Sequence, residues 1–268
     1  MKEKYLCGFI GAGNMGSAIA KAVSKKCGGN CVFVCDRHKE KTDRLKNECN
    51  CVVSSAEEIC RKCDFIFLAV KPDGFCDTAE SMMPFLSERK SAYTVVSMAA
   101  GITVKEISKL FGENASVIRI MPNTPCSVGS GMTVFDFQNT DDGRINAFKE
   151  IFEYAGRLEY LDESLIDAAG AVSGCGPAFA YMFIESLADG AVECGLPRDK
   201  AVMLAAQTVL GAADTVLKTK KHTSELKDEV CSPKGTTIEG VRALEKGKMR
   251  AAVMDAVIAS YEKTAKLK

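Results

Sequence analysis

The sequence predicts an α/β protein, with an N-terminal Rossmann-like, doubly wound sheet followed by an all-helical C-terminal domain. In the first half, short β-branched apolar runs alternate with helical stretches, as in the βαβ units that build a parallel sheet. From about Ile166 onward, Ala-rich helical stretches separated by breakers replace these runs. We therefore expect a sheet domain over residues 1–162 and a helical domain over residues 163–268.

Apolar runs in the first half are expected to form the strands of the sheet. The run from Phe65 to Val70 lacks polar alternation, which is typical of a strand buried on both faces. In an open parallel sheet, ligands bind beyond the carboxyl ends of the strands, so the turns that follow the strands are the expected place for a site. The expected strands are Tyr5–Ile10, Cys31–Cys35, Phe65–Val70, Thr94–Met98 and Val117–Ile120.

Long helical stretches dominate the second half. The segment Ala201–Leu217 is apolar on more than one face, and such a helix must be buried nearly all round. A domain of this size is small for enclosing it, so we expect a homodimer or a higher homo-oligomer to cover part of it. The alternative is a central helix within one domain. The expected helices are Pro177–Cys194, Arg198–Thr219, Glu239–Glu245 and Arg250–Thr264.

The composition is that of an ordinary globular protein, with 47% hydrophobic and 26% charged residues. Lys+Arg 35 and Asp+Glu 35 give a formal net charge of +0, so we expect no nucleic-acid partner, because phosphate binding needs a basic surface. No apolar stretch approaches the roughly 20 residues that span a bilayer, and no secretory signal pattern follows the N-terminus. These features predict no membrane association and a cytoplasmic location.

Thirteen cysteines accompany this lack of a signal pattern. In a reducing compartment such thiols serve as small, largely buried apolar side chains. Cys60 and Cys63 form a Cys-x-x-Cys pair, with Cys49 and Cys51 just upstream, and paired thiolates at this spacing are also typical zinc ligands. Because the wider arrangement matches no standard zinc module, we expect free thiols and no metal.

The strongest local motif is Gly-x-Gly-x-x-Gly over residues 11–16, directly after an apolar strand and before a helical stretch. In this context the motif indicates a dinucleotide site rather than a glycine-rich turn without a nucleotide. Gly11 permits the tight turn, Gly13 lets backbone amides approach the pyrophosphate, and Gly16 allows the helix to pack closely on the strand. The residues expected to contact the cofactor here are Gly11, Ala12, Gly13, Asn14 and Met15.

Asp36 and Arg37 carry opposing signals about the cofactor. Asp36 lies 20 residues past Gly16, where an acidic residue usually bonds the ribose 2′-hydroxyl and favours NAD. Arg37 follows it directly, and an arginine near this position accommodates the 2′-phosphate of NADP. The sequence therefore indicates NADPH or NADH without choosing between them.

Three further turns end strands at the same edge of the expected sheet. Pro72 stops one strand and constrains Lys71 to an extended conformation. Met98–Gly101 and Met121–Pro125 end the next two strands, and together the three turns predict a lined cleft beside the cofactor. The additional cofactor contacts expected here are Ala69, Val70, Lys71, Pro72 and Ala99.

Segments from both halves of the chain resemble the pyrroline-5-carboxylate reductase family. The N-terminal segments Gly8–Gly16, Ala69–Pro72 and Met121–Pro125 also resemble the wider group of hydroxyacid-dehydrogenase-like enzymes. The C-terminal half separates the two groups, through the small-residue helix entry and the long signature segment of the reductases. The matching C-terminal segments are Ser173–Ala178, Leu226–Gly240, Leu244–Glu245 and Arg250–Ala251.

One residue departs from the pattern of that family. The family usually has a glycine where this chain has Lys234. If the position requires a positive φ, a lysine there costs roughly 1–2 kcal/mol of local strain. The substrate loop of this chain either tolerates a non-glycine or has a slightly different shape.

The resemblance implies hydride transfer from NADPH or NADH to the C=N carbon of 1-pyrroline-5-carboxylate, which gives L-proline in the last step of proline biosynthesis. The cofactor supplies the difficult chemistry, and the protein supplies a pocket for the substrate carboxylate and a hydrogen bond near the ring nitrogen. The breaker-rich turn before the helix at residues 232–237 suits an anion, because free N–H groups and the helix dipole attract negative charge. The expected substrate contacts are Ser232, Gly235, Thr236 and Thr237, with the Thr237 hydroxyl as the catalytic group.

Several alternatives compete with this interpretation. Ser232 and Thr237 are residues that also cap helices, and capping alone would explain them. A 3-hydroxyacid dehydrogenase-like enzyme would require a lysine at the position of Ala180. A non-catalytic dinucleotide-sensing protein would keep the glycine motif without needing the 232–237 loop. Neither His38 nor His222 is a convincing acid or base, so catalysis is expected to rest on proximity and orientation, with the proton coming from solvent.

Overall fold

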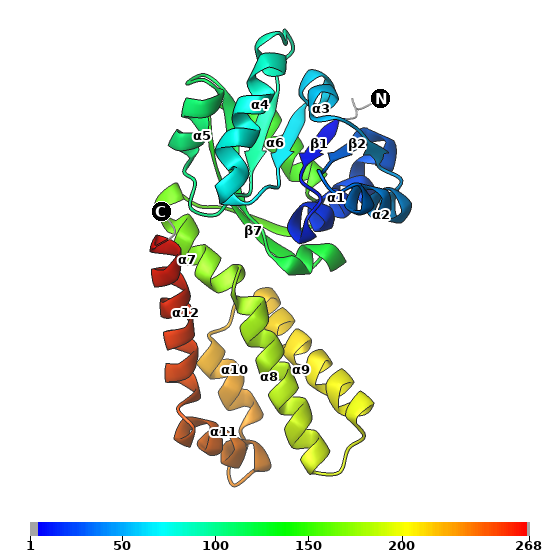
Figure 1. The fold of residues 1–268 in the computed structure, drawn as a ribbon. Helices are drawn as coiled ribbons and strands as arrows, with labels where there is room; N and C mark the ends of the chain where they lie inside the picture. Colours follow the sequence, from blue (N-terminus) through cyan, green and yellow to red (C-terminus); the bar gives the residue numbers. More distant parts are fainter. Residues whose placement is uncertain (1–4, 267–268) are drawn as a thin grey trace. The chain divides into compact units, whose positions relative to one another are not determined.

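The computed structural model describes residues 5–266, which divide into two compact units (Figure 1). The first, here the sheet unit, comprises the chain up to Cys175 together with the stretch from Ser260 onward. The second, the helical unit, comprises Gly176–Ala259. The expected domain boundary between residues 162 and 163 remains a prediction.

The sheet unit contains an eight-stranded sheet in the order β3-β2-β1-β4-β5-β6-β7-β8. The first six strands are parallel, β7 is antiparallel to β6, and β8 is parallel to β7. An order of 3-2-1-4-5-6 is that of the doubly wound Rossmann fold, so the expected fold class is confirmed. The strands are β1 Cys7–Ile10, β2 Val32–Cys35, β3 Val52–Val53, β4 Phe65–Leu68, β5 Thr94–Ser97, β6 Ser116–Met121, β7 Gly131–Gln138 and β8 Gly156–Tyr160.

The five strands expected from the sequence are present, most of them shorter than expected, and three others were missed. The run from Phe65 ends at Leu68 rather than Val70, and the amide of Ala69 makes the last bond to β1, to the carbonyl of Ile10. β3 is only two residues long, which is too short for a periodic pattern. β8 lies at the end of the sheet and is partly exposed, so its sequence lacks an apolar run.

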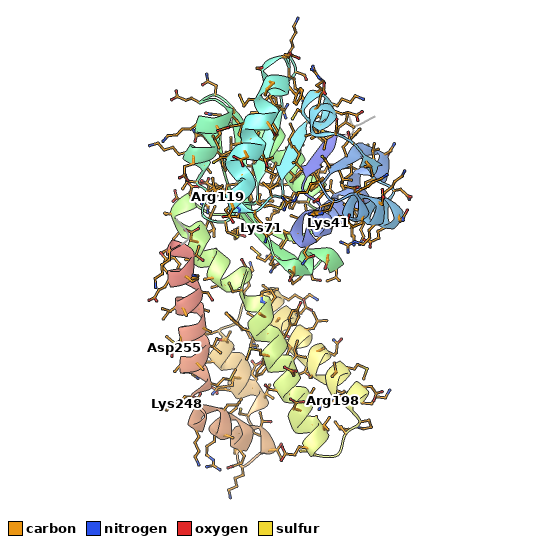
Figure 2. The ribbon with its side chains drawn as sticks, viewed as in Figure 1. Lys41, Lys71, Arg119, Arg198, Lys248 and Asp255 are labelled. Carbon is orange, nitrogen blue, oxygen red and sulfur yellow. The ribbon has the colours of Figure 1, made fainter. Side chains whose placement is uncertain are left out.

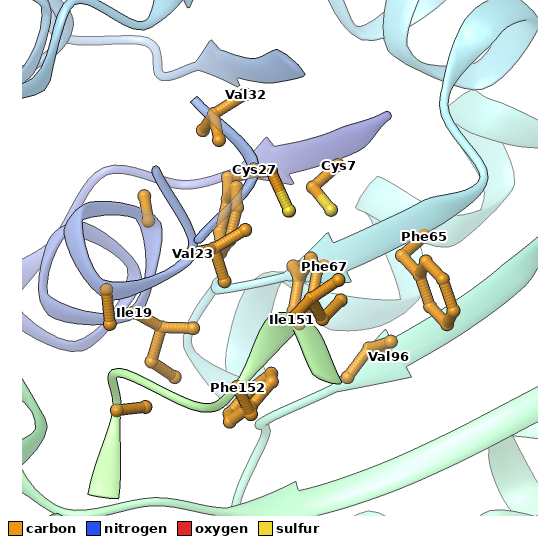
Figure 3. Close-up of a cluster of buried hydrophobic side chains, with 14 of the residues drawn as sticks. Cys7, Ile19, Val23, Cys27, Val32, Phe65, Phe67, Val96, Ile151 and Phe152 are labelled. Carbon is orange, nitrogen blue, oxygen red and sulfur yellow. The ribbon is translucent and has the colours of Figure 1, made fainter. Parts of the chain in front are cut away.

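Two hydrophobic clusters cover the two faces of the sheet, as the alternation of side chains along β4 shows. Phe65 and Phe67 belong to the cluster under α1, α2 and α6, whereas Ile66 and Leu68 belong to the cluster under α3, α4 and α5. Figure 3 shows the first cluster around Phe67. The helices are α1 Asn14–Cys27, α2 Lys39–Cys49, α3 Ala56–Lys62, α4 Phe75–Ser87, α5 Val104–Phe111, α6 Asp142–Ile151 and α7 Glu163–Ser173.

The helical unit buries little of its apolar surface within one chain. Its core of buried residues is Ala188, Ala201 and Ala205, where α8 packs on α9. Leu204 and Leu210 of α9 are 49% and 59% exposed. From the sequence we expected a subunit interface to cover part of this helix. The helices are α8 Gly176–Glu193, α9 Arg198–Thr219, α10 Thr223–Val230, α11 Thr236–Lys246 and α12 Met249–Ala265.

By length and composition, α9 is also apolar enough to cross a membrane. This corrects the expectation that no stretch approaches that length. A single helix of this kind is weak support for a membrane span, because helices that are covered in soluble proteins pass the same test.

We expect Phe67→Ala to lower the free energy of unfolding by about 3–5 kcal/mol, because it opens a cavity in the first cluster. The Phe67 ring is fully buried and stacks on Phe9, with ring centroids 4.4 Å apart. Chemical denaturation measures the loss. The matched control is Val128→Ala, since Val128 is 75% exposed and its truncation should change stability by less than about 0.5 kcal/mol. Equal effects of the two variants would contradict this packing.

Candidate functional site

The glycine motif lies at the carboxyl end of β1, and two of its glycines serve the packing of the chain itself. Gly11 has a φ of +106°, a conformation that L side chains rarely adopt. A Cβ on Gly16 would lie 2.4 Å from the carbonyl oxygen of Gly11 and 2.7 Å from the Cβ of Ala69. These two glycines therefore allow the turn, α1 and the end of β4 to lie against one another.

Gly13 differs from its neighbours in the motif. Its φ of −70° suits any residue, and a Cβ built on it meets no atom of residues 5–266 within 4 Å. It is the N-cap of α1, which has no side-chain cap, so its surroundings include unpaired amides at the positive end of a helix. Nothing inside the described chain requires a glycine here. The open space and the free amides fit a bound pyrophosphate.

Asp36 follows the end of β2 and contacts the glycine loop directly. Its Oδ2 accepts a hydrogen bond from the amide of Ala12 at 2.7 Å, and its Oδ1 accepts one from the amide of His38 at 2.9 Å. Partial burial favours the neutral carboxyl, but these amides and the charge of Lys41 outweigh it and hold the pKa of Asp36 below its usual value. The carboxylate thus fastens the loop while each oxygen keeps a lone pair for a ligand hydroxyl.

The turns after β4 and β5 form a hollow at the same edge of the sheet. Lys71 is extended, with φ −67° and ψ 153°, as predicted from the following Pro72. The hollow has a volume of about 340 Å³ and joins two of the three turns expected to line a cleft. Ala99 is buried beside it, with its amide donating to Ser97. The residues lining the hollow are Pro72, Asp73, Ala100, Gly101, Ile102, Thr103 and Glu106.

In the helical unit, α11 begins directly after the loop at residues 232–235, without a side-chain cap from its N-cap residue. Gly235 is the N-cap of α11 and has no side chain, so neither Ser232 nor Thr237 occupies the capping position that the alternative gave them. Thr236 and Thr237 occupy the first turn and are exposed. The free amides of that turn are available to an anion.

Lys234 precedes this helix in a left-handed conformation, with φ +59°. The position does adopt a positive φ, so the lysine carries the strain expected from the sequence. A Cβ on the next residue, Gly235, would lie 2.3 Å from the Oγ of Ser232, which shows how tight the turn is.

The Cys-x-x-Cys pair is buried in the sheet unit. Burial raises the pKa of Cys60 to about 11 and that of Cys63 to about 12, so both remain thiols at neutral pH. Among residues 5–266, no group of three or more His, Cys, Asp or Glu side chains is arranged to hold a metal ion.

Two buried polar residues of β6 and the turn after it had partners that the sequence did not reveal, although the turn itself, Met121–Pro125, was expected to line the cleft. Arg119 is 1% exposed in β6 and pairs with Glu163 and Asp167 of α7. Asn123, just after β6, donates to the carbonyl of Ser173 and accepts from the amide of Met132. For Arg119, the sequence did offer one indication: a charged residue within an apolar strand is buried only when it is paired.

Comparison with known proteins shows similarity along the whole chain. Residues 163–267 match the family described as pyrroline-5-carboxylate reductase dimerisation, and residues 7–101 match NADP oxidoreductase coenzyme F420-dependent. The pyrroline-5-carboxylate reductase of Arabidopsis thaliana is 40% identical over 99% of this chain and 96% of its own length. The chain belongs to the pyrroline-5-carboxylate reductase family.

Other reductases of this family agree in sequence and in structure. The Escherichia coli K12 enzyme is 40% identical, with 97% of each chain covered. The crystal structure of the Plasmodium falciparum pyrroline carboxylate reductase with NADP bound has a TM-score of 0.86 at 34% identity, covering 98% of this chain and 97% of that one. Family membership gives this chain an NAD(P)-binding domain and a dimerisation domain, and it sets aside the hydroxyacid dehydrogenase alternative.

We expect Gly13→Val and Gly16→Ala to fail in different ways. Gly13→Val should abolish cofactor binding with an unchanged melting temperature, because its side chain occupies only the open space beyond the loop. Gly16→Ala should lower the melting temperature, because its Cβ overlaps the backbone of Gly11. NADPH and NADH titrations beside thermal melts separate the two. Normal cofactor affinity in folded Gly13→Val would refute the site.

Relief of strain should make Lys234→Gly more stable. The gain should be about 0.5–1 kcal/mol, since the left-handed penalty disappears while the glycine adds unfolded-state entropy. Lys220→Gly is the matched control, because Lys220 has a φ of +57° at the end of α9, outside the loop. Denaturant titration measures both. A loss of stability in Lys234→Gly alone would mean that the lysine side chain makes stabilising contacts.

Proposed function

We propose that this chain catalyses hydride transfer from NADPH or NADH to the C=N carbon of 1-pyrroline-5-carboxylate, giving L-proline. The observation that carries the proposal is 38–40% identity to curated pyrroline-5-carboxylate reductases over nearly the whole chain. The uncapped start of α1 beneath an open Gly13 supports it physically, because a reductase of this type needs a place for the pyrophosphate.

The cofactor would be held at the carboxyl ends of β1, β2, β4 and β5. Amides of the glycine loop would bind the pyrophosphate, and the residues after β2 would contact the adenosine ribose. The turns after β4 and β5 would border the nicotinamide. When bound, the cofactor supplies the hydride. The proposed contacts are Gly11, Ala12, Gly13, Asn14, Met15, Asp36, Arg37, Ala69, Val70, Lys71, Pro72 and Ala99.

The loop before α11 would hold the substrate. The amides of Thr236 and Thr237, with Gly235, would bind the carboxylate at the positive end of the helix, and Ser232 would add a second contact. The Thr237 hydroxyl would hydrogen-bond the ring nitrogen, which gains electron density and then a proton as the hydride reaches carbon. Solvent supplies that proton, and the protein contributes orientation.

The assembly and the location follow from two further features. The exposed apolar faces of α9 support a homodimer or a higher oligomer built on the dimerisation domain. All thirteen cysteines lie within the described residues and are free thiols, which supports a reducing compartment such as the cytoplasm. The proposal includes no nucleic-acid and no membrane partner.

Turnover tests the activity directly. Reduced nicotinamide should be oxidised when 1-pyrroline-5-carboxylate is added to the full chain, and L-proline should form in equal amount. Gly13→Val serves as the control without a cofactor site. Cofactor binding without turnover would instead favour a dinucleotide-sensing protein.

Asp36 and Arg37 should select the cofactor in opposite directions. Arg37→Ala should weaken NADPH more than NADH, because it removes a charge that pairs with the 2′-phosphate. Asp36→Ala should weaken NADH more than NADPH, and it should also loosen the loop that its carboxylate fastens. The measurement is the ratio of the two kcat/KM values. If neither variant changes this ratio, neither residue reads the 2′ position.

Thr237→Val keeps the shape of the residue and removes its hydroxyl. If that hydroxyl bonds the ring nitrogen, kcat/KM for the imine should fall about 10- to 150-fold, the equivalent of roughly 1.5–3 kcal/mol. Cofactor affinity and melting temperature should be nearly unchanged, since Gly235 rather than Thr237 is the N-cap of α11. Thr223→Val in the first turn of α10 is the matched control. Near-normal kcat/KM in Thr237→Val would show that the Thr237 hydroxyl does not bond the ring nitrogen.

A further inference from the structure

Arg119, labelled in Figure 2, lies in the middle of β6. Its guanidinium is divided between two carboxylates. Its Nη1 donates to Oε1 of Glu163 at 2.9 Å, and its Nη2 donates to Oδ1 of Asp167 at 3.0 Å. Glu163 and Asp167 are one turn apart in α7, so the planar fork of the arginine fixes both the distance and the rotation of that helix.

Helix α7 is also held at two further points, by Met121 at the end of β6 and by Asn123 just after it. Arg119, Met121 and Asn123 alternate along the extended chain and so point to one side of it. A Cβ on Gly170 of α7 would lie 3.4 Å from Cγ of Met121, and the side-chain amide of Asn123 donates to the carbonyl of Ser173 at 2.9 Å. These contacts anchor α7 along its whole length.

Glu163 also holds the loop that follows β5. Its Oε1 accepts from the amide of Val104 at 2.6 Å as well as from Arg119. Val104 begins α5 and ends the loop from Ala99 to Thr103, which lines the hollow at the edge of the sheet. One carboxylate oxygen therefore joins β6, α7 and this loop.

Stability alone is a poor explanation for this buried charge. Burying ionic groups costs solvation that an apolar residue of similar volume would not lose. Moreover, the Nε of Arg119 is buried without a hydrogen-bond partner among the described residues. Unlike an apolar residue, the guanidinium fixes the geometry between β6, α7 and, through Glu163, the loop after β5.

We infer that Arg119 is a positioning residue for hydride transfer: through Glu163 and Asp167 it locks the Ala99–Thr103 loop and helix α7 to the cofactor-binding sheet. The loop borders the proposed nicotinamide site, and α7 carries Glu163, whose carboxylate holds the end of that loop. The inference rests on the proposed function. A small displacement of this loop would misplace the proposed nicotinamide site that it borders, and such errors cost rate rather than binding.

Arg119→Lys tests the inference, because lysine keeps the buried charge but has a single nitrogen that cannot bond both carboxylates in fork geometry. We expect kcat per folded subunit to fall about 10- to 100-fold. The primary deuterium isotope effect on kcat, measured with NADPH deuterated at C4 of the nicotinamide, should rise as hydride transfer becomes rate-limiting. Hydrogen exchange should accelerate in α7 and in the Ala99–Thr103 loop, while NADPH affinity stays near normal.

Arg61→Lys is the matched control, since Arg61 also pairs with two carboxylates, Glu57 and Glu88, but on the exposed surface of the same unit. It should behave as the unmodified chain in all four measurements. If Arg119→Lys does not fold, Asp167→Asn replaces it, with faster exchange expected in α7 and a lower kcat. A lower melting temperature with unchanged isotope effect, kcat per folded subunit and α7 exchange would overturn the inference.

The proposed function can fail separately from this inference. If the unmodified chain does not reduce 1-pyrroline-5-carboxylate, the proposed function fails. The locking of α7 is then judged by hydrogen exchange alone. Faster exchange in Arg119→Lys but not in Arg61→Lys would support the lock itself, and equal exchange would reject it.

Discussion

The close approach of the turn after β1 to the end of β4 is the constraint on which the nucleotide site depends. Gly11 passes within reach of the Ala69 carbonyl, and α1 starts directly above both because Gly16 has no side chain. This contact places the free amides of α1 at the point where strand order reverses, between β1 and β4. A larger residue at either glycine would move the helix start and with it the anion site.

Asp36 shows that one residue can serve both the loop and the ligand. From the sequence, its position predicts a contact with the ribose. In the structure, its oxygens are already bonded to the amides of Ala12 and His38, so the charge stabilises the loop before any cofactor binds. A preformed loop loses little entropy on binding, which favours affinity without additional contacts.

The sequence predicts best those features that depend on residues close to one another in the chain. The strand that begins at Phe65 and the extended Lys71 depend on neighbouring residues, and both are present, although the strand ends two residues earlier than expected. The glycine motif joins β1 to α1, as expected. β3 and β8 were missed because one is too short and the other too exposed for a pattern. The partners of Arg119 lie more than 40 residues away in sequence, so only tertiary structure brings them together. The roles assigned to the loop before α11 remain predictions.

The sparse core of the helical unit links folding to assembly. A few alanines between α8 and α9 give little hydrophobic free energy to offset the entropy of ordering five helices. Most of that free energy must come from a second copy, which makes stability a function of protein concentration. For a dimer, each tenfold dilution removes about 1.4 kcal/mol. A newly made chain would therefore complete its helical half only on meeting another, and the rate of that step would be second order in chain concentration.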